Sequence, residues 1–114
     1  MSAKLSTRQV GDVHVMDVEG RITLGEGSSA LRDALRQMVG SNKKKILLNL
    51  GKVSYIDSSG IGELVSAFTT ATNQGGQLKL LNLTKRVKDL LQITKLYTVF
   101  DVHDDEAAAI RSFN

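Results

Sequence analysis

The sequence predicts an α/β fold with a mixed sheet, mostly parallel, that carries an antiparallel N-terminal strand and about four helices. Short apolar runs of strand length alternate with longer segments whose apolar residues recur every three or four positions. Such alternation is typical of parallel strands joined by helices. Near the N-terminus, Gly11-Asp12 separates two runs that can pair as a hairpin. The chain has no proline, so glycines, polar caps and periodicity define the element boundaries.

An N-terminal hairpin is the first element that the pattern indicates. Residues 10–18 place Val13, Val15 and Val18 among polar residues, with one slip in the alternation at Met16. A period of two is typical of a strand that is buried on one face. We therefore expect a half-buried strand that pairs with the residues preceding the glycine turn.

Two amphipathic helices are predicted, one on each side of a central strand. The first ends at Gly40, and the second covers residues 59–73 and ends at Gly75-Gly76. Between them, residues 46–50 form a nearly continuous apolar run, which indicates a strand covered on both faces. The first helix has Ser28 or Ser29 as its cap and Ala30, Leu31, Ala34, Leu35, Met38 and Val39 as its stripe. The second has Ile61, Leu64, Val65, Phe68 and Ala71.

The C-terminal third predicts two more strands and two more helices. Residues 78–83 and 98–102 are apolar runs of strand length. Thr84 can cap the third helix, and Asp104 or Asp105 can cap the fourth. The third helix has the apolar residues Val87, Leu90 and Leu91 with Ile93 as a further candidate, and the fourth has Ala107, Ala108, Ile110 and Phe113.

Length and composition limit the class of protein. A chain of 114 residues with 41% hydrophobic residues has the size of a single domain that spans residues 1–114. The absence of cysteine excludes disulfides, thiolate nucleophiles and iron–sulfur clusters, and it favours a cytoplasmic protein. Apolar stretches are far shorter than the ~20 residues that cross a bilayer, so we expect no membrane span.

Charge gives little support to nucleic-acid binding. The net charge is +3, but the basic residues are scattered except at Lys43-Lys44-Lys45, which we interpret as a solvated loop. Aromatic residues make up 4% of the chain, too few for platforms on which bases stack. We expect no direct contact with nucleic acid.

Neither catalysis nor a metal centre is predicted, and we expect no enzyme activity and no cofactor. His14 and His103 lie far along the chain from Ser58, so a Ser-His-Asp arrangement would need one of them to cross the fold. Two histidines without cysteine make a poor metal site. The acidic run 104–106 is more simply the solvated start of a helix.

The most informative stretch is the turn Asp57-Ser58-Ser59-Gly60, where the central strand gives way to the second helix. Strand ends of this kind host functional sites, and a helix N-terminus stabilises a phosphate on a serine. Gly60 and Gly62 are expected to leave the turn bare, so that a partner or a kinase can reach Ser58. Composition alone also fits Asp57 as a helix cap without any function.

Residues 54–62, Ser-Tyr-Ile-Asp-Ser-Ser-Gly-Ile-Gly, resemble the signature of STAS domains in bacterial anti-sigma factor antagonists. The similarity continues at residues 18–22, 30–32, 45–50, 75–80 and 87–91. This resemblance implies a STAS-like fold in which Ser58, the first serine after the aspartate, is phosphorylated. It also implies a partner switch. The unphosphorylated form binds an anti-sigma factor, usually a serine kinase that uses its own ATP, and frees a sigma factor; a serine phosphatase restores this form.

The resemblance also implies a partner-binding surface around the turn. That surface comprises Asp57, Ser58, Ser59, Gly60, Ile61 and Gly62, together with Thr23, Gly25 and Ser28. Thr23 stands where the family usually carries an aspartate, and this departure leaves open whether binding or phosphorylation is altered.

Two other functions remain open. The same fold can be a scaffold subunit of a stress-signalling or lipid-transport complex, in which the turn is only a docking corner. Residues 25–30, Gly-Glu-Gly-Ser-Ser-Ala, match the G-x-G-x-x-A dinucleotide fingerprint and suggest a nucleotide-binding module. No acidic residue follows at the end of a clear second parallel strand, as that fingerprint requires, so a glycine-rich connection is the better interpretation.

Overall fold

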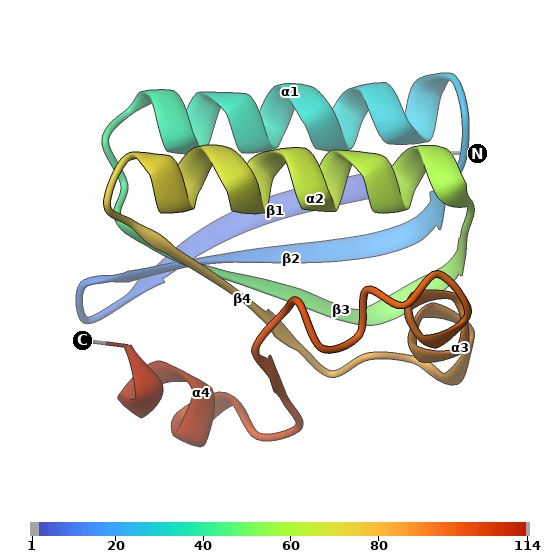
Figure 1. Ribbon diagram of the computed structural model, residues 1–114. Coiled ribbons are helices and arrows are strands. Elements are labelled where there is room, and N and C mark those ends of the chain that lie inside the picture. Colours follow the sequence, from blue (N-terminus) through green and yellow to red (C-terminus); the bar gives the residue numbers. More distant parts are fainter. Residues whose placement is uncertain (1–2, 114) are drawn as a thin grey trace.

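A computed structural model describes residues 3–113, which form one five-stranded sheet and four helices (Figure 1). In chain order the elements are β1 (Ala3–Val10), β2 (Val13–Ile22), α1 (Glu26–Gly40), β3 (Lys45–Ile56), α2 (Ser58–Asn73), β4 (Gln77–Leu81), α3 (Lys85–Ile93), β5 (Val102–His103) and α4 (Glu106–Ser112). The strands follow one another across the sheet in the order β1-β2-β3-β4-β5.

The sheet is mixed, as predicted. β1 and β2 pair as an antiparallel hairpin, and the pairs β2–β3, β3–β4 and β4–β5 are all parallel. The pairing of β2 with β3 shifts register twice, between Asp17 and Glu19 and again between Gly20 and Arg21. Each shift inserts an extra residue on β3, and such irregularities re-aim the side chains that follow them.

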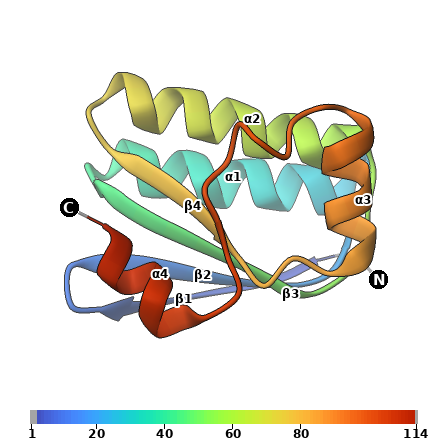
Figure 2. The same cartoon turned by 60° about the horizontal axis from the view of Figure 1, so that its bottom comes forward.

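Helices cover both faces of the sheet. Figures 1 and 2 show α1 and α2 side by side on one face, α4 on the opposite face, and α3 at the end of the fold where α1 and α2 begin. The face under α1 and α2 carries the larger core, in which Met16 and Leu48 are fully buried. A smaller core lies under α4 and consists of Val13, Val15, Leu47, Leu81, Ala109 and Phe113. The prediction that β2 is half-buried was therefore wrong, because α4 covers its second face.

The first helix begins earlier than predicted, because its N-cap lies three residues before Ser28, the first of the two predicted caps. Gly25 is the N-cap, with a φ of 102° and no side-chain capping bond, and Ser28 is buried within the first turn. A positive φ favours glycine, so Gly25 lets the chain leave β2 and enter α1 directly. A Cβ at Gly27 would collide with the carbonyl oxygen of Arg21, so the second glycine packs the helix start against β2. These two backbone requirements account for the glycines of the dinucleotide-like pattern without a nucleotide.

The C-terminal third differs most from prediction. Residues 98–101 are turn and loop, and only β5 (Val102–His103) joins the sheet, so the predicted strand 98–102 was wrong. Packing holds this loop instead, because the ring of Phe100 meets that of Phe68 edge to face at 5.2 Å between centroids. Ile93 is 77% exposed and does not extend the apolar stripe of α3.

Both C-terminal helices have side-chain caps. Thr84 caps α3 as predicted, and Asp105 rather than Asp104 caps α4 by accepting a hydrogen bond from the amide of Ala108 at 2.9 Å. The apolar face of α4 is shifted from the predicted one, because Ala109 is buried and Ala107 is exposed. Phe113 lies just beyond the end of α4 and is buried in the smaller core.

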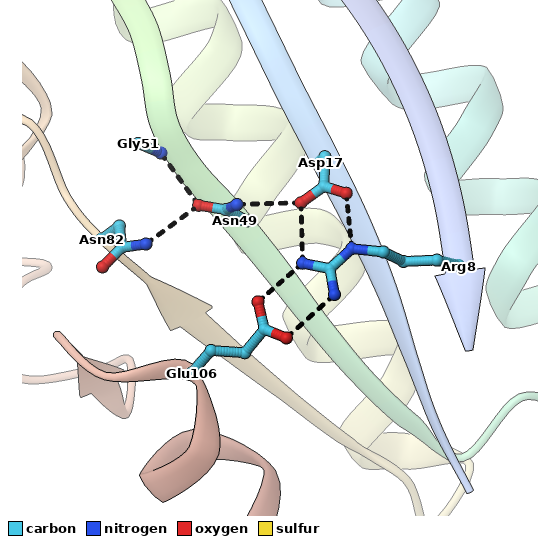
Figure 3. Close-up of polar contacts among 6 residues, drawn as sticks. All are labelled: Arg8, Asp17, Asn49, Gly51, Asn82 and Glu106. Carbon is cyan, nitrogen blue, oxygen red and sulfur yellow. Dashed lines mark hydrogen bonds and ion pairs between the residues drawn. The ribbon is translucent and has the colours of Figure 1, made fainter. Parts of the chain in front are cut away.

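A charged network ties α4 to the N-terminal hairpin (Figure 3). The Arg8 guanidinium donates to both oxygens of Asp17, at 2.7 and 3.1 Å, and to both oxygens of Glu106, at 2.9 and 2.7 Å. Asn49 of β3 donates to Asp17 at 2.8 Å and accepts hydrogen bonds from Asn82 and the amide of Gly51. One arginine thus joins β1, β2 and α4, and Asn49 extends the network to β3.

We expect replacement of Arg8 to make the unfolding free energy depend less on pH in the acidic range. Hydrogen bonds from Arg8 lower the pKa of Asp17 and of Glu106 from their usual 3.8 and 4.5. A carboxyl group whose pKa is lowered in the folded protein stabilises the fold at any pH above its usual pKa. This stabilisation is lost as the pH falls through the lowered pKa. Arg8→Gln should cost about 1 kcal/mol at neutral pH, because the network is partly exposed.

The measurement is urea unfolding between pH 7 and pH 2. Below about pH 4.5, stability should fall less steeply in Arg8→Gln than in the unmodified protein. Arg111→Gln removes the same charge from an exposed side chain of α4 that has no ion pair among residues 3–113, and it should keep the original slope. Equal acid slopes in all three proteins would contradict the role of Arg8.

Candidate functional site

The turn between β3 and α2 is organised by the carboxylate of Asp57. One oxygen, Oδ1, accepts hydrogen bonds from the amides of Ser59 at 3.0 Å and Gly60 at 3.2 Å, and from the Ser59 hydroxyl. Asp57 is therefore the N-cap, and α2 begins at Ser58, one residue before the predicted start. The interpretation of Asp57 as a helix cap is therefore correct. Capping of α2 involves only Oδ1 and does not explain the contact that Oδ2 makes.

That second oxygen holds the β2–α1 loop against the turn. Oδ2 of Asp57 accepts the amide of Leu24 at 3.0 Å, and the amide of Asp57 donates to the carbonyl of Ile22 at 3.2 Å. Thr23 and Gly25, which flank Leu24, are thereby brought to the Ser58 turn. The Ser59 hydroxyl and the amides of Leu24, Gly60 and Ser59 lower the pKa of Asp57, so the carboxylate stays ionised at neutral pH.

The two serines of the turn occupy different positions. Ser58 is exposed at the first position of α2, and no hydrogen bond engages its hydroxyl among the described residues. Ser59 is half-buried, and its hydroxyl donates to Asp57. The sequence left open which hydroxyl is available for modification; in the folded chain the free one belongs to Ser58.

Gly60 serves packing rather than access. A Cβ on this residue would lie 2.7 Å from side-chain carbons of Ile22 and Ile56 and 2.8 Å from the Ile22 carbonyl oxygen. The expectation that Gly60 bares Ser58 therefore needs correction, because its missing side chain makes room for the core beneath the turn. Gly62 is exposed with no heavy atom within 4 Å of an added Cβ, so it does leave its surroundings open.

Only part of the predicted partner surface is accessible. Ser58, Gly25 and Gly62 are exposed, while Thr23 is half-buried. Ser28 and Ile61 are buried, so their side chains pack inside the fold instead of facing outward. The apolar stripe of α2 had already placed Ile61 inward, and that signal was sufficient to exclude it from a surface.

Leu24 is a surface residue that the sequence analysis missed. Its side chain is 82% exposed, more than that of any other large hydrophobic residue in the part of the chain that the structure describes. The hydrogen bond from its amide to Asp57 fixes it beside the Ser58 turn. Leu24 lies just past the end of β2, in a stretch that the sequence pattern assigned to no helix or strand, so nothing in the pattern distinguished it.

The acidic run 104–106 and the other possible metal ligands share no site within the described residues. Across residues 3–113, no three His, Cys, Asp or Glu side chains gather as a metal site would require. The acidic start of α4 is structural, because Asp105 is the helix cap and Glu106 binds Arg8. None of the helices in the described range combines the length and apolarity needed to span a bilayer.

The family model for STAS domains matches residues 4–109. The chain belongs to the STAS domain family. Among curated relatives, the anti-sigma-B factor antagonist of Bacillus subtilis is 45% identical over 53 residues, which cover 46% of this chain and 49% of that protein. The anti-sigma F factor antagonist of Paenibacillus polymyxa is 26% identical over 65 residues, or 57% of this chain and 56% of that protein. The alignments thus span about half the length of each of these relatives.

Two solved structures share the fold. An anti-sigma factor antagonist from Mycobacterium paratuberculosis superposes with a TM-score of 0.89 at 17% identity, covering 98% of this chain and 94% of that one. The Bacillus cell fate determinant SpoIIAA in its phosphorylated form superposes with a TM-score of 0.75 at 19% identity, covering 95% and 97%. The mixed five-stranded sheet with four helices is therefore the STAS architecture, as the resemblance implied.

A pair of glycine substitutions tests the packing beneath the turn. Gly60→Ala should lower the unfolding free energy by about 1–3 kcal/mol, since its methyl group overlaps Ile22 and Ile56. Gly62→Ala, two residues along the same helix, should be neutral or stabilising by up to about 1 kcal/mol, because alanine favours helix and the space is open. Chemical denaturation measures both, and equal stabilities would refute the close approach at Gly60.

Proposed function

We propose that this protein is an anti-sigma factor antagonist, a non-enzymatic binding protein of the cytoplasm that is controlled by phosphorylation of Ser58. Unphosphorylated, it binds an anti-sigma factor that is also a serine kinase, and the sigma factor is released. The kinase then phosphorylates Ser58 and the complex separates, until a serine phosphatase removes the phosphate. The names of the curated relatives support this function, and the free, exposed hydroxyl of Ser58 at the start of α2 carries it.

The position of Ser58 suits a reversible charge switch. A phosphate at the first position of a helix is stabilised by the helix dipole, so modification leaves the fold intact. The ionised carboxylate of Asp57 stands next to it, and a phosphoserine adds about two more negative charges. Local charge therefore rises from about −1 to about −3, and a partner that buries the turn must desolvate all of it.

Leu24 supplies the apolar part of the proposed interface. Interfaces depend on a few anchors that become fully buried, surrounded by polar contacts. Leu24 is such an anchor, because it is exposed and its backbone is fixed to the Ser58 turn through Asp57. A partner seated on Leu24 also covers Ser58, so one surface both binds the partner and presents the hydroxyl to it.

Substitutions at Ser58 test the switch against the serine kinases and anti-sigma factors encoded by the same genome. With ATP, the wild-type protein should gain phosphate at Ser58 alone by peptide mass spectrometry and lose the complex. Ser58→Ala should stay bound, and Ser58→Asp should bind at least about tenfold more weakly by calorimetry, because of the buried charge. Ser66→Ala, at an exposed serine farther along α2, should behave like wild type. Equal affinities of Ser58→Ala and Ser58→Asp would refute the switch.

A substitution at Leu24 tests the apolar anchor separately from phosphorylation. Leu24→Ser should weaken kinase binding by about 10- to 100-fold, which corresponds to burial of one leucine side chain. Its unfolding temperature should not change, because the side chain is already exposed. Leu24→Met keeps the apolar surface and should bind like wild type. Unaltered affinity of Leu24→Ser would exclude this residue from the interface.

A further inference from the structure

Two arginines from distant parts of the chain converge on one tyrosine. Arg21 of β2 lies opposite Tyr55 of β3 in the sheet, with its guanidinium carbon 4.8 Å from the ring centroid. Arg86, in the first turn of α3, places its guanidinium carbon 4.2 Å from the same centroid. We call Arg21, Arg86 and Tyr55 together the arginine cluster. Strand register and helix packing, rather than any sequence motif, bring them together.

No carboxylate of the described residues neutralises the positive charge of the cluster. Neither Arg21 nor Arg86 forms an ion pair with a carboxylate among residues 3–113. Arg8, by contrast, is bound by two carboxylates. The tyrosine ring attracts both cations but accepts none of their in-plane hydrogen bonds. Their donors are therefore free to bind an anion.

The cluster lies close to the Ser58 turn. Tyr55 precedes Ser58 by three residues, so their Cα atoms are at most about 11 Å apart even along extended chain. Figures 1 and 2 show α3, which carries Arg86, at the end of the fold where α2 begins. A standard interface covers about 800 Å² per partner, a patch about 30 Å across. A partner centred on Ser58 therefore reaches the cluster.

The surroundings favour an acidic protein surface as the occupant. Basic residues dominate α3 and the loop after it: Lys85, Arg86, Lys88 and Lys95. Asp89 is the only acidic residue of α3, and Lys85 neutralises it at 2.6 Å. Guanidinium groups match the planar, two-oxygen geometry of carboxylates. Because the Tyr55 ring is already occupied by cations, it does not offer a platform on which a nucleic-acid base can stack.

We infer that Arg21 and Arg86, held in place by Tyr55, bind an Asp or Glu side chain on the surface of the anti-sigma factor. This inference rests on the proposed function and names a second contact for the same interface. Leu24 and Ser58 provide an apolar and switchable contact, and the cluster provides a charge contact whose strength falls with salt.

The test compares two double variants that remove the same charge. Arg21→Gln/Arg86→Gln removes the cluster, and Arg36→Gln/Arg111→Gln removes two arginines of α1 and α4 that have no ion pair in the described range. The cluster variant should bind the kinase about 10- to 100-fold more weakly at low salt, and the difference should shrink at high salt. The matched control should change affinity less than about threefold. Arg21→Lys/Arg86→Lys should recover only part of the loss, since lysine lacks the planar fork.

The outcomes separate this inference from the proposed function. Equal binding by the two double variants overturns the cluster contact, whereas Ser58→Asp, measured in the same series, reports on the switch alone. Thermal unfolding checks the fold of each variant, and Arg86→Gln alone repeats the test at an exposed residue if the double variant is destabilised. The inference is also overturned if Arg21→Gln/Arg86→Gln loses affinity for a DNA duplex but keeps its affinity for the kinase.

Discussion

The carboxylate of Asp57 joins the two connections that meet around Ser58, which are the β2–α1 loop and the turn between β3 and α2. Its two oxygens accept the amides of Ser59, Gly60 and Leu24, so one side chain starts α2 and also fixes the β2–α1 loop. These donors are backbone groups, so the hydrogen bonds themselves require the aspartate but no particular side chain at Leu24, whereas Gly60 is required for packing. The same bonds keep Asp57 ionised and engage the hydroxyl of Ser59, which leaves the hydroxyl of Ser58 free.

Rigidity beneath the turn comes from the larger core. α1 and α2 cover one face of β2 and β3, and α4 covers the other face only near the start of these strands, at Val13, Val15 and Leu47. Ile22 and Ile56, the last residues of these strands, are buried directly under the turn and leave no room for a side chain at Gly60. The backbone of the turn therefore lies on tightly packed side chains, while the side chain of Ser58 above it is exposed.

Periodicity and caps in the sequence were sufficient for the fold class, the hairpin, the order of the elements and the turn at Asp57. They were insufficient where tertiary contacts decide. The positive φ of Gly25 moved the start of α1, and the packing of Phe100 on Phe68 replaced a predicted strand with a loop. Leu24 could not be recognised because exposure depends on what the fold leaves uncovered. Arg21 and Tyr55 meet only because β3 gains two residues relative to β2, which no local pattern reveals.

The attachment of α4 has a consequence for how the chain folds during synthesis. Arg8 and Glu106 are 98 residues apart in sequence, and the smaller core joins Val13 and Val15 to Ala109 and Phe113. Contacts of such long range close late, because the whole segment between the two residues must be synthesised before they can form. The larger core contains no residue of α4, so its contacts do not depend on those that attach α4. Until α4 is in place, Val13 and Val15 on the outer face of β2 lack the apolar cover that Ala109 and Phe113 provide.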